Sequence, residues 1–396
     1  MTSFIFLCTM MLSATQLEAF TPLALQTKRL YANPLYVVEV EQEIQPENLK
    51  EPESIQVPLK FIGPYPTMGL RFPNLATKNQ KAQNKTGISL DFVLDTAANT
   101  NTINAQVASE LELEVVGEAL PGLSSAGAMQ GGQTYMLGDS QLEGIQMKEE
   151  MGEDGIFMQN LTASALPIAS PASAGLLSLP FFYCFEGGVE FSWGSSALKD
   201  GMPDPASITF YGDEETAVTK ALPGMTRVLI DPIPVTQLPS VMLNINGMKV
   251  PALLDTGSPI TVLNSEAARQ AGIATIQLPP DGEEKSNNPF AAFANRFKNA
   301  QAAAKAAANG DLLTIAGSDG KPTNLLKSTS TFDLSLSGDS EDVSFGSGHI
   351  YVGDIPGLAA LNGIGVDSPP AAVLGMDVLR KRPRMFLRAR DQEVYF

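Results

Sequence analysis

The 396-residue sequence has a single histidine, His349, and two cysteines. His349 lies in "FGSGHIYVGD" without a second His or a Cys nearby, which argues against a histidine-based zinc site and against a Ser-His-Asp triad. The sequence also has no G-x-S-x-G, no P-loop and no G-x-G-x-x-G motif. Whatever chemistry this chain performs must therefore come mainly from carboxylates.

Basic residues are also scarce, since 26 Lys and Arg stand against 43 Asp and Glu, for a net charge of −17 and a pI near 4.5. The one basic cluster, "RKRPR" at 380–384, is short, and we interpret it as a solvated turn. Without a basic stripe that could neutralise phosphates, the composition argues against binding of nucleic acid.

The N-terminal segment has the pattern of a targeting sequence. "FIFLCTMML" at 4–12 is too short to span a bilayer and is typical of a signal peptide. The following Ala19-Phe20-Thr21-Pro22 resembles the cleavage motif of diatom-type algal plastid proteins. We expect residues 1–54 to hold this presequence and a pro-segment or linker, with the mature protein in the plastid and free of membrane. Secretion or the endomembrane lumen is the alternative. Removal of Cys8 would leave Cys184 without an intrachain partner, which favours a reducing compartment.

An internal repeat indicates the architecture. Asp95 and Asp255 begin the two Asp-Thr dipeptides of the chain, in "VLDTAANTNTIN" and "LLDTGSPITVLN". In each motif an apolar run leads up to the Asp, and a second apolar segment follows a few residues after it. Asn104 and Asn264 each lie nine positions after their Asp and are predicted to cap a short helix. The chain therefore reads as two homologous halves.

The rest of the sequence consists of short apolar runs broken by Gly and Pro, which predicts an all-β fold. We expect one β lobe over 55–215 and a second over 225–396, joined by a linker at 216–224. The polar stretch 73–87 is predicted to be a long hairpin loop in the first lobe.

An Ala-rich insert at 276–311 interrupts the second lobe and is predicted to form a helix that begins at Pro289 and ends near Gly310. Its predicted apolar face consists of Phe290, Phe293, Phe297, Ala300, Ala304 and Ala308. We interpret the helix as packed on its own lobe, and a gate over a cleft or a partner-binding helix are the alternatives.

The repeated motifs resemble those of the aspartic proteases, both retropepsin-like and pepsin-like. The second half has "LLDTGS" and, later, "VLG" at 373–375, and the first has "VLDTAA" and "LLS" at 176–178. The resemblance implies a single-chain, two-lobed endopeptidase with its active site between the lobes. It implies a catalytic dyad of Asp95 and Asp255, with supporting residues Thr96, Ala97, Thr256, Gly257 and Ser258. It also implies a polypeptide substrate, a monomer, and no metal or cofactor.

Paired carboxylates suit this reaction because two of them held about 3 Å apart cannot both ionise and so share one proton. One then activates water while the other protonates the carbonyl oxygen of the substrate. Ser258 is expected to donate a hydrogen bond to the dyad, which Ala98 cannot do in the first half. This asymmetry predicts a dyad that titrates high enough to extend activity toward neutral pH.

Such enzymes cover the cleft with a hairpin flap, for which residues 124–139 are the candidate because their glycines permit a mobile tip. Tyr135 is the candidate flap tyrosine, and a packed structural tyrosine is the alternative. The matching segment of the second lobe is 315–321.

Ala97 and Ser178 both stand where the family has glycine, so activity is most in doubt in the first half. One alternative is therefore a catalytically inactive protein that binds peptides in the same cleft. A second is a kinase-like or ATPase fold, since "DTGSPIT" also fits a phosphate-binding loop. ATP-dependent thermal stabilisation would support that second reading.

Overall fold

The computed structural model describes residues 8–9, 54–119, 122–124, 127–129, 132–143, 158–166, 173–199, 202–233, 236–278, 289–316, 322–355, 358 and 369–396. The predicted presequence thus lies outside the described residues, apart from Cys8–Thr9 and Ser54. Within the described ranges, no helix has the length and apolar character needed to cross a membrane.

In the described part of the chain, the first half forms an eight-stranded sheet in the order β3-β4-β5-β12-β6-β11-β10-β7. The strands, in that order, are Lys60–Ile62, Tyr65–Phe72, Ile88–Leu94, Gly175–Leu177, Thr102–Asn104, Met158–Leu166, Gln133–Leu142 and Glu114–Glu118. β5 runs parallel to β12, β12 pairs antiparallel with β6, and β6 runs parallel to β11. An additional pairing of β10 with β4 curls the sheet back on itself.

The second half repeats this plan in a sheet with the order β22-β23-β26-β21-β27-β20-β19-β24-β25, in which β18 also pairs with β19. Its strands, in that order, are Leu312–Ala316, Pro322–Lys327, Tyr351–Val352, Val262–Leu263, Ala372–Leu374, Met248–Leu254, Pro239–Ile245, Phe332–Leu336 and Val343–Gly348, with β18 at Asp231–Pro232. β20 is parallel to β27, β27 antiparallel to β21, and β21 parallel to β26. The central order β4-β5-β12-β6-β11 therefore recurs as β19-β20-β27-β21-β26, which confirms an all-β fold with two homologous lobes.

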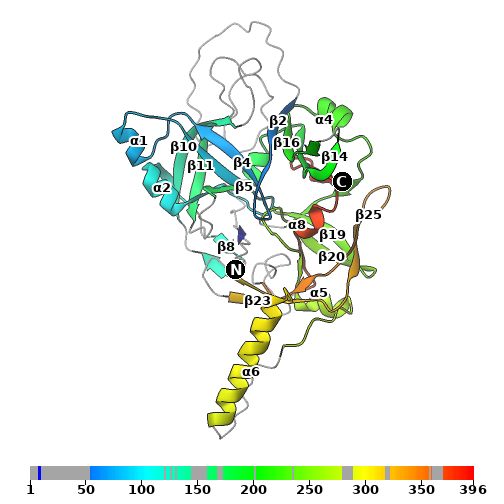
Figure 1. The fold of residues 1–396 in the computed structure, drawn as a ribbon. Helices are drawn as coiled ribbons and strands as arrows, with labels where there is room; N and C mark the ends of the chain where they lie inside the picture. Colours follow the sequence, from blue (N-terminus) through cyan, green and yellow to red (C-terminus); the bar gives the residue numbers. More distant parts are fainter. Residues whose placement is uncertain are drawn as a thin grey trace.

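A third sheet, with six strands among the described residues, takes strands from both halves in the order β17-β29-β28-β13-β16-β2. Their bounds are Arg227–Leu229, Glu393–Tyr395, Arg384–Arg388, Gly188–Ser192, Ser207–Tyr211 and Ser54–Pro58. The halves meet where β13 pairs antiparallel with β28. In Figure 1 this sheet lies beside the first-lobe sheet and above the second-lobe sheet. Smaller pairings join β14 (Ser195–Lys199) to β15 (Met202–Asp204) and join β1 (Cys8–Thr9), β8 (Gly122–Ser124) and β9 (Gly127–Met129).

Short helices follow the strands at equivalent places in the two lobes. α2 (Ala105–Leu111) and α5 (Ser265–Gln270) are capped by the predicted asparagines, whose side chains accept from the amides of Gln106 and Ala267 at 2.9 and 2.8 Å. α3 (Leu179–Phe182) and α8 (Met376–Leu379) follow β12 and β27. α4 (Glu214–Lys220) occupies much of the segment that was predicted to be a linker.

The polar stretch 73–87 is not only a loop, because it contains α1 (Lys78–Ala82). The hydroxyl of Thr77 accepts from the Gln80 amide at 3.3 Å, and the Gln80 side chain accepts from the Thr77 amide at 2.9 Å. This reciprocal capping box supplies partners for two amides that a helix start otherwise leaves free. It explains how one and a half turns of helix form without a single buried residue.

The predicted insert helix is present as α6 (Pro289–Ala308), which projects from the body of the molecule (Figure 1) and is followed by Gly310 at φ +71°. The prediction of its apolar face was wrong in the part whose side chains are described. Ala300, Ala304 and Ala308 are exposed, whereas the more buried positions are Ala302, Ala303 and Ala306. The predicted phenylalanines lie outside the described side chains. The reason is that the phase of an alanine-rich helix is set by its tertiary contacts, here with β22, rather than by weak differences in hydropathy.

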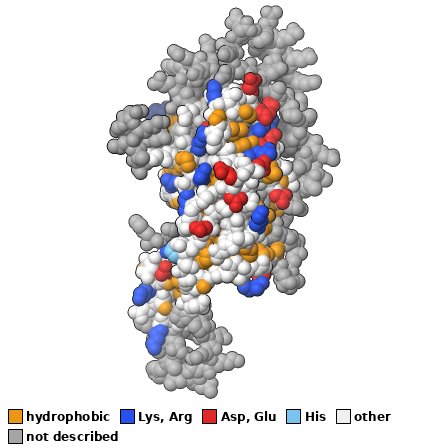
Figure 2. All heavy atoms as spheres, turned by 90° about the vertical axis from the view of Figure 1, so that its right-hand side faces the viewer, with side chains coloured by type: hydrophobic (Ala, Val, Ile, Leu, Met, Phe, Trp, Pro, Cys, Tyr) orange, Lys and Arg blue, Asp and Glu red, His pale blue; other side chains and the backbone are white. Residues whose placement is uncertain are grey.

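The last residues of the central strands β5 and β20 are buried, so the apolar core of each lobe extends to the boundary between the lobes. Figure 2 shows the face toward which β16, α4 and β25 lie, where acidic and basic side chains are interspersed.

Candidate active site

Asp95 and Asp255 each follow the last residue of a central strand, β5 or β20. The Asp95 amide donates to the carbonyl of Leu177 on β12 at 2.9 Å, and the Asp255 amide donates to Leu374 on β27 at 3.1 Å. Each strand therefore keeps its partner up to the aspartate, which fixes where the carboxyl lies. Both side chains are buried, with 4% and 2% of their surface exposed.

Thr96 and Thr256 connect the two lobes directly. The Thr96 amide donates to the Thr256 hydroxyl at 3.1 Å, and the Thr256 amide donates to the Thr96 hydroxyl at 3.0 Å. Each hydroxyl then donates across the boundary, to Leu254 or to Leu94, at 2.7 Å in both cases. The predicted supporting residues thus form a reciprocal arrangement close to two-fold symmetry.

This arrangement brings the two aspartates together, so that their carboxyl groups interact directly. Asp95 Oδ1 also accepts from the Ala97 amide at 2.8 Å, and the amides of Gly257 and Ser258 face the Asp255 carboxyl. Among the described residues, Asp255 Oδ1 is buried without a hydrogen-bond partner. Two carboxyls that interact in this way can share one proton.

The surroundings raise the pKa of both carboxyls. Burial raises the pKa of Asp95 to about 6, although the amide of Ala97 and the hydrogen bond from Asp255 act in the opposite direction. Burial, followed by the neighbouring charge of Asp95, raises the pKa of Asp255 well above its ordinary value. The two carboxyls therefore titrate as a pair that keeps one proton to a higher pH than an isolated aspartate does.

The expected role of the Ser258 hydroxyl was wrong. Ser258 Oγ donates to the carbonyl of Ile260 at 2.9 Å, so it is the backbone amide of Ser258 that faces Asp255. The hydroxyl closes its own turn because the carbonyl two residues on lies within reach. The raised pKa of the dyad consequently comes from burial rather than from a missing hydroxyl at Ala98.

Tyr135 lies on β10, between β7 and β11, and its hydroxyl donates to the Gln133 side chain at 2.8 Å. Its ring packs against the first-lobe core. The role of Tyr135 as a flap tyrosine stays a prediction. The tip of the predicted flap lies partly outside the described residues, and the hairpin of β22 and β23 flanks the matching segment 315–321.

Ser178 is accommodated by a residue that sequence reasoning missed, Asn101. The Asn101 side-chain oxygen accepts from both the amide and the hydroxyl of Ser178, at 3.0 and 3.2 Å. In the second lobe the Thr261 hydroxyl accepts from the Gly375 amide at 3.1 Å. Asn101 and Thr261 each lie six positions after their aspartate. An alignment of the two halves on Asp95 and Asp255 places Asn101 opposite Thr261, and this equivalence could have indicated the role of Asn101.

Asn99 is a second residue that the sequence did not indicate. Its side chain is 3% exposed, and neither its oxygen nor its nitrogen has a hydrogen-bond partner among the described residues. It lies four positions after Asp95, where the second half has Pro259. A buried unpaired amide is costly, so this position is a place where the first half departs chemically from the second.

Comparisons with known proteins agree with the motif in the second half. A family model described as Aspartyl protease matches residues 241–288, which include Asp255. The chain also aligns with two solved structures. One is basic 7S globulin from soybean, at TM-score 0.40 and 10% identity over 87% of this chain and 96% of that one. The other is conglutin gamma, a basic 7S globulin from lupine seeds, at TM-score 0.42 and 11% identity over 87% and 95%. No curated protein matches the chain.

Proposed function

We propose that this protein is an aspartic endopeptidase that hydrolyses peptide bonds through the dyad of Asp95 and Asp255. The observation that carries the proposal is the meeting of two buried carboxyls from equivalent strand ends, and burial raises the pKa of both. The match of residues 241–288 to the aspartyl protease family supports the same reading.

In the proposed reaction, ionised Asp95 removes a proton from a water molecule as its oxygen attacks the peptide carbonyl carbon. Asp255 donates its proton to the carbonyl oxygen, which gives a neutral tetrahedral intermediate. Proton transfer from Asp95 to the amide nitrogen then breaks the carbon–nitrogen bond, and Asp255 recovers its proton from the intermediate. One water is consumed, and one amine and one acid are formed.

The experiment is cleavage of an internally quenched peptide library from about pH 4 to about pH 9, a range wide enough to show both limbs of a dyad profile. Activity is expected to rise with pH as Asp95 ionises near 6 and to fall when Asp255 loses the shared proton. Asp95→Asn and Asp255→Asn should each lower kcat/KM by about 10³-fold or more.

The matched control is Asp91→Asn, which changes a carboxylate on the same strand, β5, that pairs with Lys60 at 3.0 Å on the surface. It should leave cleavage unchanged. Peptide binding without cleavage by the wild-type protein would replace the proposal with an inactive peptide-binding protein. That alternative is favoured by the departures at Ala97 and Ser178 in the first half.

A further inference from the structure

The second residue after each aspartate faces the opposite carboxyl. A Cβ added to Gly257 would lie 2.5 Å from Asp95 Cγ and Oδ2, and 2.8 Å from Oδ1, so glycine is required there while Asp95 keeps its place. The equivalent residue in the first half is Ala97, whose side chain is 3% exposed. Neither Ala97 nor Gly257 has a positive φ, so the difference between the two positions is steric rather than conformational.

The turns that follow Asp95 and Asp255 are related by nearly exact two-fold symmetry, so the surroundings of Gly257 indicate those of Ala97. The reciprocal threonine hydrogen bonds differ by only 0.1 Å between the two directions, since they measure 3.1 and 3.0 Å, and the hydroxyl-to-carbonyl bonds are equal at 2.7 Å. By this symmetry we expect the methyl group of Ala97 to face Asp255, as an added Cβ at Gly257 would face Asp95. Ala97 belongs to an apolar cluster with Leu253 and Val373, which come from the two strands that flank Asp255.

At Gly257, the position of Asp95 leaves no room for a methyl group. The equivalent residue Ala97 does carry a methyl group, so Asp255 cannot occupy the position that corresponds by two-fold symmetry to that of Asp95. The hydrogen bonds of the two carboxyls show this asymmetry. Asp95 Oδ1 accepts a backbone amide at 2.8 Å, whereas Asp255 Oδ1 has no partner among the described residues.

We propose that Ala97 is a positioning residue that makes the dyad asymmetric: its methyl group keeps the Asp255 carboxyl out of the position that corresponds by two-fold symmetry to that of Asp95, so that the shared proton resides on Asp255. Among the described residues, the Asp95 carboxyl is the titratable group whose charge acts on Asp255. The backbone amides of Gly257 and Ser258 are the other polar neighbours of the Asp255 carboxyl. Tyr183 and Tyr351 pack against the same apolar cluster, and burial raises the pKa of each, so both stay neutral in the range that matters.

The test is an infrared titration of the buried carboxyls, with Asp95→Asn and Asp255→Asn used to assign the bands. This readout needs no activity, although the consequence for catalysis rests on the proposed function. In Ala97→Gly the pKa of Asp255 should fall by about one unit, because its carboxyl can then take the position in which Asp95 accepts a backbone amide, while the pKa of Asp95 should stay in place. If the enzyme is active, the alkaline limb of its pH–rate profile should move toward acid by the same amount and the acidic limb should not.

Ala98→Gly is the matched control, since it removes a buried methyl from the same turn at the position where the second-half residue, Ser258, directs its side chain to Ile260 rather than to the dyad. It should leave both pKa values unchanged. Ala97→Ser provides a second variant that retains the Cβ and adds a hydroxyl donor, and it should also lower the pKa of Asp255. An unchanged pKa in both Ala97 variants, or an equal shift in Ala98→Gly, would overturn the proposal. A wild-type protein without proteolytic activity but with the expected shifts would refute only the proposed function.

Discussion

Thr96 and Thr256 exchange hydrogen bonds in both directions across the boundary between the lobes, with each amide donating to the hydroxyl of the other. Both side chains are fully buried. The contact fixes the relative position of the two strand ends, because neither residue can move without breaking bonds made by the other. The placement of the dyad therefore depends on two hydroxyl groups.

Thr256→Ala should lower the free energy of unfolding by about 2–4 kcal/mol, because it removes two hydrogen bonds and leaves the buried Thr96 amide unpaired. Thr256→Ser retains the hydroxyl and should cost much less. Urea denaturation measures both variants. A value for Thr256→Ala within about 0.5 kcal/mol of wild type, the range of an ordinary surface substitution, would show that the contact is dispensable.

The dyad should make stability depend on pH. The folded-state pKa of Asp95 is raised from 3.8 to about 6, so the folded protein binds this proton more tightly than the unfolded chain does. This contribution is fully present below about pH 4 and is lost as the pH rises through 6. Asp95→Asn should therefore become more stable relative to wild type between those pH values, by an amount on the order of a few kcal/mol. Denaturation at a series of pH values measures the difference, and a constant difference would contradict the raised pKa. Asp91→Asn, near the surface, is the control.

Ser178 and Gly375 occupy equivalent positions but should not be interchangeable. A Cβ on Gly375 would lie 2.3 Å from the carbonyl oxygen of Ile260 and 2.9 Å from that of Ser258, so Gly375→Ser should destabilise the protein by roughly 3 kcal/mol. Ser178→Gly loses one hydrogen bond to Asn101 and should cost about 1 kcal/mol. Thermal or chemical unfolding of both variants checks the contrast. Equal effects would mean that the two lobes do not differ in packing here.

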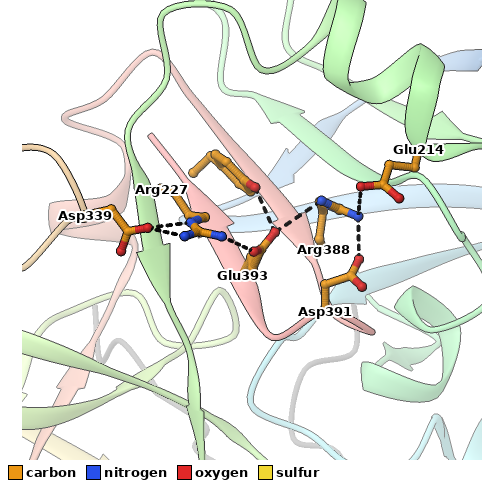
Figure 3. A network of polar contacts seen from close by, with 7 residues as sticks. Glu214, Arg227, Asp339, Arg388, Asp391 and Glu393 are labelled. Carbon is orange, nitrogen blue, oxygen red and sulfur yellow. Dashed lines mark hydrogen bonds and ion pairs between the residues drawn. The ribbon is translucent and has the colours of Figure 1, made fainter.

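Figure 3 shows a polar network on the six-stranded sheet, in which Glu393 lies between two arginines. Arg227 donates to Glu393 at 2.8 Å and to Asp339 at 2.6 Å. Arg388 donates to Glu393 at 3.2 Å and pairs with Glu214 and Asp391 at 2.9 and 2.7 Å. The Tyr395 hydroxyl also donates to Glu393, at 2.7 Å.

Glu393→Gln should destabilise the protein by about 3 kcal/mol, because it removes the carboxylate that pairs with the buried guanidinium of Arg388. Glu214→Gln, at a side chain that is 62% exposed, should change stability by less than about 1 kcal/mol. The comparison is made by denaturation at low and high salt. A larger effect at Glu214 than at Glu393 would contradict the view that burial determines the strength of these pairs.

The sequence predicted those features that local chemistry decides. The asparagine caps of α2 and α5, the beginning of α6 at Pro289, and the paired strands that end in Asp95 and Asp255 follow from patterns within a few residues. The internal repeat then predicted two homologous β lobes.

Features that depend on tertiary contacts were not predictable in the same way. The Ser258 hydroxyl was expected to donate to the dyad, and only the folded turn shows that it donates to Ile260. The pairing of Asn101 with Ser178 joins positions 77 apart, and nothing local marks it. The face of α6 that is buried depends on where β22 lies.

The shared six-stranded sheet has a consequence for how the protein is made. Glu190 on β13 and Arg384 on β28 form an ion pair at 3.0 Å although they are 194 positions apart, and β13 pairs with β28 along its length. On a ribosome, the first lobe can emerge and close its own sheet, but one edge of β13 has no partner until β28 has been synthesised. During that interval the nascent chain exposes an unpaired strand edge, which is the kind of surface that chaperones bind and that aggregates when left uncovered.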